Sequence, residues 1–291
     1  MRMSLDPTML PSFASSSVAR SVWHSSKLPA ALLAAVLTMV AASPVIAQAR
    51  KESYVPDVGQ EGKDVVWVPT PQVLVEKMLD IAKVTPQDYL IDLGSGDGRL
   101  VITAAKRGLR SHGIEYNPDM AELARKNAAQ AGIAERATFA TADLFETDLS
   151  QAQVITMFLL PTLNEKLRPR ILDLKPGTRI VSNSFTMGDW KADQTATVTE
   201  GCSHFCTALL WVVPVKVEGT WQLDGQQLNL TQSFQMLSGK LGSVDISDAR
   251  LDGSRISFTA NGARYTGEVD GTTIKGTVVG GADGNWSATK G

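Results

Sequence analysis

The sequence has little cysteine and few aromatic residues. Its 291 residues include two cysteines, and aromatic residues make up 6% of the chain. Two cysteines exclude a fold built on disulfides and a four-thiolate zinc site. The low aromatic content argues against stacking platforms for single-stranded nucleic acid.

An excess of charge of one sign is also missing. The formal net charge is -2 at pH 7. This argues against a protein that grips nucleic-acid backbone by bulk charge, because such proteins are usually strongly basic. Hydrophobic residues make up 43% and charged residues 20% of the chain, which excludes a mostly disordered protein. The length corresponds to about two domains.

The first part of the chain, residues 1–49, has the pattern of a secretory leader. A basic, serine-rich stretch precedes the apolar run at 28–42, and Ala-Gln-Ala at 47–49 fits the small-x-small rule of signal peptidase. We therefore expect cleavage after Ala49 and an exported protein, periplasmic or secreted. Two alternatives stay open: an uncleaved membrane anchor over 28–47, and an organelle transit peptide.

The rest of the chain divides into an arm and two domains. Residues 50–64 are polar and lack an apolar period, which predicts a linker or arm. Over 65–214, apolar strands alternate with helices, which predicts an α/β fold with a parallel sheet covered on both faces. Its last two strands have no helix between them, so we expect an antiparallel pair at one edge. Residues 218–291 alternate apolar and polar residues between Asp-Gly and Asn-Gly turns, which predicts a small antiparallel β meander, a half-barrel or a sandwich.

The strongest chemical signal is the glycine-rich segment IDLGSGDGR at 91–99. Its glycines lie where a strand turns into a helix, and without Cβ atoms they let backbone amides approach a ligand closely. A dinucleotide site needs a third glycine at the position of Arg99. The acids Asp92 and Asp97 would repel a pyrophosphate but suit a ligand with an amino group and a sulfonium. This favours S-adenosylmethionine over NAD, while a plain strand-to-helix turn is the alternative without a ligand.

Two further acids follow the next two predicted strands. Glu115 ends the second strand, where a carboxylate can accept hydrogen bonds from ribose hydroxyls, as it also does in NAD enzymes. Asp143 follows the third strand, where it can accept from an adenine amino group, with the Leu144 amide facing the ring. Taken alone, Glu115 is also explained as a helix cap and Asp143 as a turn residue. Their order behind the glycine loop makes a ligand site the stronger interpretation.

The motifs DLGSGDGR, GIEYNP and ADLFE, in this order, resemble class I S-adenosylmethionine-dependent methyltransferases. Within that class, VPTP at 68–71 and FLLP at 158–161 resemble the protein-lysine methyltransferases that include the ATP synthase c-subunit lysine methyltransferase. The resemblance covers roughly 65–214, and it implies a Rossmann-like sheet, S-adenosyl-L-methionine as cofactor and a protein lysine as methyl acceptor. The expected cofactor contacts are Thr70, Asp92, Gly94, Ser95, Gly96, Asp97, Gly98, Glu115, Tyr116, Asp143 and Leu144.

The acceptor side of the site is less defined. No catalytic base can be named. Phe158 and Pro161 at the end of the fourth strand, and Trp190 after the fifth, are candidates for the substrate side, with core packing as the alternative. The Asn/Asp-Pro-Pro-aromatic motif of enzymes that methylate amino groups of bases or glutamine is absent. Together with the net charge, this argues against a nucleic-acid partner.

Cys202 and Cys206 flank a short segment that contains His204. Three potential ligands within five residues make a poor tetrahedral site, so we expect no metal. A disulfide requires Cα atoms within about 7 Å, which a loop allows and an extended strand does not. Both a disulfide and free thiols stay open, and an oxidising compartment would favour the disulfide.

Two other functions stay open beside lysine methylation. One is a non-catalytic scaffold or sensor of the envelope that binds an adenosyl ligand. The other is a small-molecule methyltransferase that acts on a lipid or quinone. The leader and the β domain depart from the lysine-methylating family, and the predicted export separates the protein from a cofactor made in the cytoplasm. Contact with a membrane is expected only through an uncleaved leader.

Overall fold

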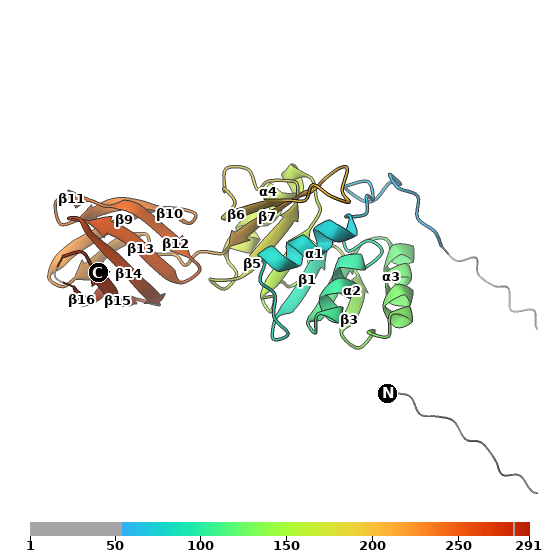
Figure 1. The fold of residues 1–291 in the computed structure, drawn as a ribbon, viewed down its shortest axis with the longest axis horizontal. Coiled ribbons are helices and arrows are strands. Elements are labelled where there is room, and N and C mark those ends of the chain that lie inside the picture. The colour runs from blue at the N-terminus through green and yellow to red at the C-terminus, as the bar shows by residue number, and fades with distance from the viewer. Residues whose placement is uncertain (1–53, 282) are drawn as a thin grey trace, which may run out of the picture. The chain divides into compact units, whose positions relative to one another are not determined.

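The structure is a computed structural model that describes residues 54–281 and 283–291. The predicted leader, its cleavage site and the first residues of the arm lie outside this part of the chain. The described strands form two sheets, one in each predicted domain (Figure 1). None of the helices in the described part is long and apolar enough to cross a membrane.

The first sheet has seven strands in the order β3-β2-β1-β4-β5-β7-β6. Its strands are β1 Tyr89–Leu93, β2 Arg110–Glu115, β3 Ala137–Thr141, β4 Val154–Met157, β5 Arg179–Asn183, β6 Gln194–Thr197 and β7 Thr207–Val212. Its helices are α1 Gln72–Ile81, α2 Arg99–Lys106, α3 Pro118–Gln130 and α4 Pro161–Leu172. Strands β1 to β5 are parallel, and β7 runs antiparallel to β5 and β6. This confirms the Rossmann-like sheet and its antiparallel edge pair.

The central strands are apolar on both faces because helices cover both. Along β1, Leu90 packs with residues of α1 and α2, whereas Ile91 packs in the core that includes residues of α4. All four residues of β4 are buried. Such continuous apolar strands are typical of parallel sheets, and they hold the carboxyl ends of β1 to β4 rigidly at one edge.

Helix α3 begins directly after β2, and its start is fixed by a cap. The Asn117 side chain accepts hydrogen bonds from the backbone amides of Asp119 and Met120, and Pro118 occupies the first helical turn. Both features are typical of helix N-termini. The cap therefore also fixes the chain beside Glu115, the last residue of β2.

The second sheet closes on itself. Its strands are β8 Gly219–Leu223, β9 Gln226–Ser233, β10 Met236–Leu241, β11 Val244–Asp245, β12 Ser247–Asp252, β13 Arg255–Ala260, β14 Ala263–Asp270, β15 Thr273–Val279 and β16 Gly284–Lys290. Neighbouring strands are antiparallel, as predicted. The half-barrel and the sandwich are wrong, because β16 pairs with β8 and β10 pairs with β9, which completes an eight-stranded barrel with β11 attached to β10.

Two of the hairpin turns of the barrel consist of the dipeptides that predicted them, whereas Asp252 and Asp270 are the last residues of β12 and β14 and only their glycines enter the turn. At Asp224-Gly225 and Asn261-Gly262 both residues have positive φ, between 45° and 85°. Two-residue hairpin turns of this kind need a left-handed conformation at both positions, which Asn, Asp and Gly adopt most readily. Inside the barrel, the rings of Phe258, Tyr265 and Trp286 pack against one another.

The glycine before α2 yields a test of packing in the first domain. Gly98 has φ +83°, and a Cβ there would lie 2.7 Å from Cζ of Phe139 and 2.9 Å from Cβ of Ala124. Gly132 has φ +70° but open space around it. We expect Gly132→Ala to lower the free energy of unfolding by about 1–2 kcal/mol through backbone strain alone. Gly98→Ala should cost about 1–3 kcal/mol more, through overpacking.

Urea unfolding followed by tryptophan fluorescence measures both variants. Because the two substitutions introduce the same left-handed alanine, Gly132→Ala is the matched control. Equal losses in the two variants would contradict the packing role of Gly98.

Candidate functional site

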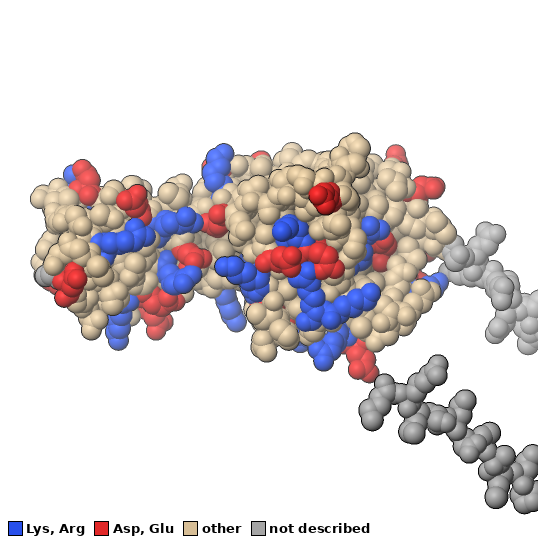
Figure 2. Space-filling model, viewed as in Figure 1, with Lys and Arg blue, Asp and Glu red and all other residues tan. Residues whose placement is uncertain are grey.

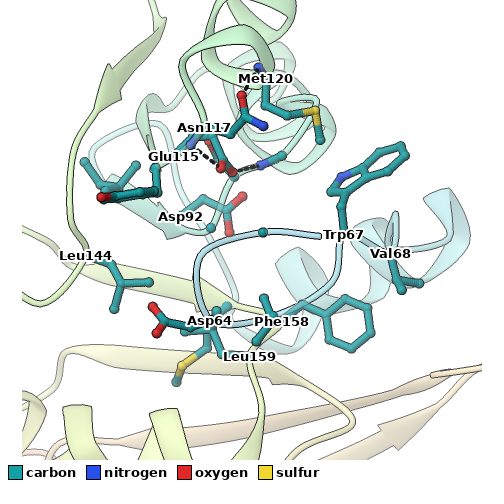
Figure 3. A pocket seen from close by; sticks show the side chains of 18 of the residues that line it. Asp64, Trp67, Val68, Asp92, Glu115, Asn117, Met120, Leu144, Phe158 and Leu159 are labelled. Atoms are coloured by element: carbon teal, nitrogen blue, oxygen red, sulfur yellow. Dashed lines mark hydrogen bonds between the residues drawn. The ribbon is translucent and has the colours of Figure 1, made fainter. Parts of the chain in front are cut away.

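A cavity of about 410 Å³ opens at the carboxyl ends of the parallel strands (Figure 3). Its volume lies in the usual range for small-molecule sites, and open α/β sheets bind ligands at this edge. Ten of the eleven predicted cofactor contacts line it: Thr70, Asp92, Gly94, Ser95, Gly96, Asp97, Glu115, Tyr116, Asp143 and Leu144. Gly98 does not line it, because Gly98 faces Phe139 and Ala124 in the core.

The glycine loop is anchored on the neighbouring strand. The amides of Gly94 and Ser95 both donate to the carbonyl oxygen of Ile114, at 2.9 and 3.0 Å. Gly96 has φ +53°, and a Cβ there would lie 2.6 Å from Nε1 of Trp67. The Ser95 hydroxyl is buried and has no hydrogen-bond partner among the described residues. The loop thus brings bare backbone to the cavity wall, while the Ser95 side chain fills the space beside Gly113 of β2.

Asp92 is the buried acid of the site. Its side chain accepts one hydrogen bond, from the Thr156 hydroxyl at 2.7 Å. Burial raises the pKa of Asp92 from 3.8 to about 7; the Thr156 hydrogen bond opposes this rise, and the negative charges of Glu115 and Asp97 add to it. A cation bound beside Asp92 would favour its ionised form.

The second acid of the loop is paired with an arginine. Asp97 forms an ion pair with Arg99, with 2.6 Å between Oδ2 and a guanidinium nitrogen. Arg99 also donates to the carbonyl oxygen of Thr70, at 2.9 Å. Asp97 lines the cavity as predicted, and its pairing with Arg99 leaves Asp92 as the acid of this motif without a basic partner among the described residues.

Glu115 links the glycine loop to the start of α3. Its two carboxylate oxygens accept from the amides of Gly96, at 2.9 Å, and Asn117, at 3.0 Å (Figure 3). A carboxylate has about four acceptor positions, so two remain for a ligand. The Glu115 carboxylate is therefore held in a fixed orientation and can still accept hydrogen bonds from a ligand.

Asp143 is paired with a lysine of the arm. The Lys63 ammonium donates a hydrogen bond to the Asp143 carboxylate, and it also lies 4.7 Å from the centre of the Tyr116 ring. The Lys63 hydrogen bond, with a further one from the Phe145 amide, lowers the pKa of Asp143. Both partners are partly exposed, and such pairs stabilise proteins only weakly. A ligand amino group can therefore replace Lys63 at this carboxylate.

The three residues predicted on the substrate side have different outcomes. Phe158 lines the cavity and lies on the opposite side of Asp92 from Glu115 (Figure 3). Pro161 opens helix α4 and does not line the cavity.

Trp190 is fully buried, so it is no substrate-side residue. Its ring stacks on Phe234, and its indole N–H donates to Oε1 of Gln235 at 2.9 Å. Trp190 is therefore a residue of the protein core, and its predicted place on the substrate side is wrong.

The two cysteines form a disulfide. Their Cα atoms are 5.8 Å apart in the loop between β6 and β7. This settles the choice that the sequence left open between a disulfide and free thiols. Among the described residues, no group of three or more His, Cys, Asp and Glu side chains is placed to hold a metal ion.

Sequence reasoning missed one entire wall of the cavity. Residues 60–69, which run from the predicted arm into the start of the predicted first domain, line it, and Trp67 lies over the glycine loop. The arm folds back through hydrogen bonds between the backbones of Gly59, Gln60 and Trp67. Phe185 and Phe205 also line the cavity and were missed. For the arm, the VPTP motif was the available signal, and for Phe205 it was the spacing of the cysteines.

The residues present fit S-adenosylmethionine. Along the sheet edge, Asp92, Glu115 and Asp143 offer acceptors at the ends of three adjacent strands, which match an ammonium group, ribose hydroxyls and an adenine amino group. Between them the wall is largely apolar, with Ile114, Met120 and Leu144 available to contact the adenine ring. The bare backbone of the glycine loop admits the ligand closely.

Comparison with known proteins agrees with this geometry. Residues 92–194 match the family model described as ANTKMT methyltransferase domain. A protein-lysine N-methyltransferase of Saccharolobus islandicus (strain REY15A) is 41% identical over 164 residues, which cover 55% of this chain and 97% of that protein. The lysine N-methyltransferase of Mus musculus that is named for the ATP synthase c-subunit is 31% identical over 163 residues, and the match spans 62% of its length.

One solved structure that resembles this chain is described as an RNA methyltransferase from Salinibacter ruber in complex with S-adenosyl-L-homocysteine. It is 47% identical, covers 52% of this chain and 96% of that one, and has a TM-score of 0.49. The chain is a class I methyltransferase with S-adenosylmethionine as its cofactor. It belongs to the family of the protein-lysine N-methyltransferases.

Proposed function

We propose that this methyltransferase N-methylates a lysine side chain of a protein. The relatives named above as lysine N-methyltransferases support this acceptor. The observation that carries the proposal is the chemistry of the cavity beyond Asp92. There the wall consists of apolar side chains that follow β4 and β5, including Phe158, Leu159 and Phe185. Such a wall fits the long alkyl stem of a lysine, which packs well on apolar surface.

The position of this wall follows from the strand order. Asp143, Glu115 and Asp92 follow or end β3, β2 and β1, and the next strands across the sheet are β4 and β5. A cofactor held by the three acids therefore leaves the ends of β4 and β5 to the acceptor. Bound S-adenosylmethionine supplies a methyl group on a positively charged sulfonium.

The chain's own residues prepare the acceptor by desolvation. A lysine enters as an ammonium ion and must lose a proton before its nitrogen can attack. Apolar surroundings lower the pKa of an amine, because they disfavour its charged form. Phe158 and Leu159 thus favour the neutral amine, and the open mouth of the cavity lets the proton pass to water.

The surface charge favours a protein acceptor over RNA. On the face shown in Figure 2, Lys and Arg side chains lie among Asp and Glu side chains on both parts of the molecule. Neutralisation of phosphates by lysine and arginine dominates affinity for nucleic acid. A protein acceptor needs no such neutralisation.

We also infer that the mature protein works outside the cytoplasm. The leader pattern at 1–49 supports an exported protein. The Cys202–Cys206 disulfide adds support, since disulfides persist in oxidising compartments and are rare in the cytosol.

Methyl transfer to lysine is tested with labelled cofactor. The full-length protein is incubated with tritiated S-adenosylmethionine and, in separate reactions, with unfractionated cell protein, total RNA and a lipid extract. We expect label in the protein fraction and methyl-lysine after acid hydrolysis, and neither with Glu115→Ala. Label confined to RNA or lipid would overturn the proposed acceptor.

Because of Asp92, we expect the free energy of unfolding and the affinity for the cofactor to change in opposite directions with pH. The folded-state pKa of Asp92 lies above the ordinary value, so the free protein loses stability as pH rises from about 4 to about 7. Asp92→Asn should therefore raise the free energy of unfolding at pH 8, by up to about 4 kcal/mol, and change it little at pH 4. The same variant should bind S-adenosylmethionine about tenfold to a hundredfold more weakly, because a charge-assisted hydrogen bond is lost.

Calorimetric titration and urea unfolding across this pH range measure both effects. Wild-type affinity for the cofactor should rise between pH 6 and pH 8, with release of about one proton, and the Asp92→Asn affinity should not. A variant that binds as well as the wild type, or that unfolds more easily at pH 8, would contradict this role of Asp92.

Export is tested by the mature N-terminus. Mass spectrometry of protein isolated from its native cells should find a chain that begins at Arg50, in the fraction outside the cytoplasm. Ala49→Leu should block cleavage and leave a longer chain. A cytoplasmic protein that retains residues 1–49 would argue against export.

A further inference from the structure

Three phenylalanine rings from separate segments meet at the acceptor end of the cavity. Phe158 follows β4, Phe185 follows β5, and Phe205 lies in the loop between β6 and β7. The ring centres lie 5.9 Å apart for Phe158–Phe185, 5.1 Å for Phe158–Phe205 and 5.8 Å for Phe185–Phe205. These are normal distances for favourable aromatic pairs. All three rings border the cavity, and none is fully buried.

Two of the rings are held by the sheet. Phe158 directly follows the fully buried strand β4. The backbone carbonyl of Phe185 accepts a hydrogen bond from the buried side chain of Asn164, at 3.3 Å. The residue before it, Ser184, has φ +60°, a conformation that is costly for a residue with a side chain and that is common at functional sites.

The third ring is held differently. Phe205 is 40% exposed and has φ +56°. It lies on a five-residue loop that the Cys202–Cys206 disulfide closes. An exposed aromatic ring with a strained backbone has few contacts that would keep it in place. The covalent closure therefore supplies the constraint that packing supplies for Phe158 and Phe185.

We propose that Phe205 completes an aromatic entrance for the acceptor lysine, and that the disulfide positions Phe205 there. This rests on the proposed lysine N-methylation. The lysine stem packs against the three rings. Phe205 is thereby a specificity-determining residue for the acceptor. It lies across the sheet from the acids that hold the cofactor, so the disulfide governs acceptor use and leaves cofactor binding alone.

The disulfide also makes acceptor use sensitive to reduction. A dithiol such as dithiothreitol donates two electrons and two protons, the Cys202–Cys206 sulfur–sulfur bond breaks, and two thiols form while the reagent closes to its own cyclic disulfide. The loop then loses its covalent closure, and Phe205 leaves the other two rings.

The test compares acceptor and cofactor kinetics in the full-length protein. The acceptor is unfractionated cell protein, and lysine methylation is counted with tritiated S-adenosylmethionine. For Phe205→Ala we expect an apparent KM for the acceptor at least fivefold above wild type, with the Kd for S-adenosylmethionine unchanged. Phe205→Tyr keeps an aromatic face and should restore most of the wild-type KM. Met236→Ala, which removes an exposed apolar side chain from the barrel, should leave both constants unchanged.

The role of the disulfide is tested by removing it in two ways. The double variant Cys202→Ser, Cys206→Ser should show the same rise in KM as Phe205→Ala, with unchanged cofactor Kd and unchanged melting temperature of the barrel. Dithiothreitol should raise the KM of the wild type to that level and should not affect the double variant.

The outcomes separate the two proposals. If the wild type methylates lysine but Phe205→Ala keeps the wild-type KM, the aromatic entrance is wrong and the proposed function stands. If the double variant and reduction leave KM unchanged while Phe205→Ala raises it, the positioning role of the disulfide is wrong. If the wild type transfers no methyl group to lysine in any reaction, the proposed function itself fails.

Discussion

A negative charge held inside the protein, at the end of β1, sets the conditions for the rest of the site. Asp92 is buried, has one hydroxyl as hydrogen-bond partner, and faces the further negative charge of Glu115. The rigid parallel sheet keeps these acids together although they repel each other. A positively charged ligand relieves that repulsion, so the core of the first domain maintains a site that is complete only with its cofactor. Stability and binding are opposed at this one residue, as is common at functional sites.

The cofactor side of the site could be predicted because its determinants are local. The glycine loop, Glu115 and Asp143 each lie at a strand end that the hydrophobic pattern marks, and parallel topology brings strand ends to one edge. The pairing of Asp97 with Arg99, two residues away, was visible in the sequence in principle. The wall formed by residues 60–69 was not predictable in this way, because this segment belongs to no helix or strand and reaches the cavity only through tertiary contacts.

Contacts between residues far apart in the sequence explain the two other predictions that were wrong, the open β domain and the place of Trp190. The alternation after residue 218 correctly predicted antiparallel strands, but closure depends on residues 288–290 meeting 221–223, which no local pattern records. Trp190 was assigned to the substrate side for a similar reason. Its position after β5 suggested the sheet edge, whereas Phe234 and Gln235, over forty residues later, cover it.

The contact of Trp190 with Phe234 and Gln235 makes the two sheets depend on each other. Gln235 accepts from the Trp190 indole and donates to the carbonyl oxygen of Lys191, while Phe234 stacks on the Trp190 ring. The Saccharolobus islandicus relative is matched over 97% of its length by 55% of this chain. In this chain, loss of the barrel would expose the Trp190 indole to water and create an apolar surface patch that promotes aggregation. By covering Trp190, Phe234 and Gln235 of the barrel thus protect the first domain from self-association.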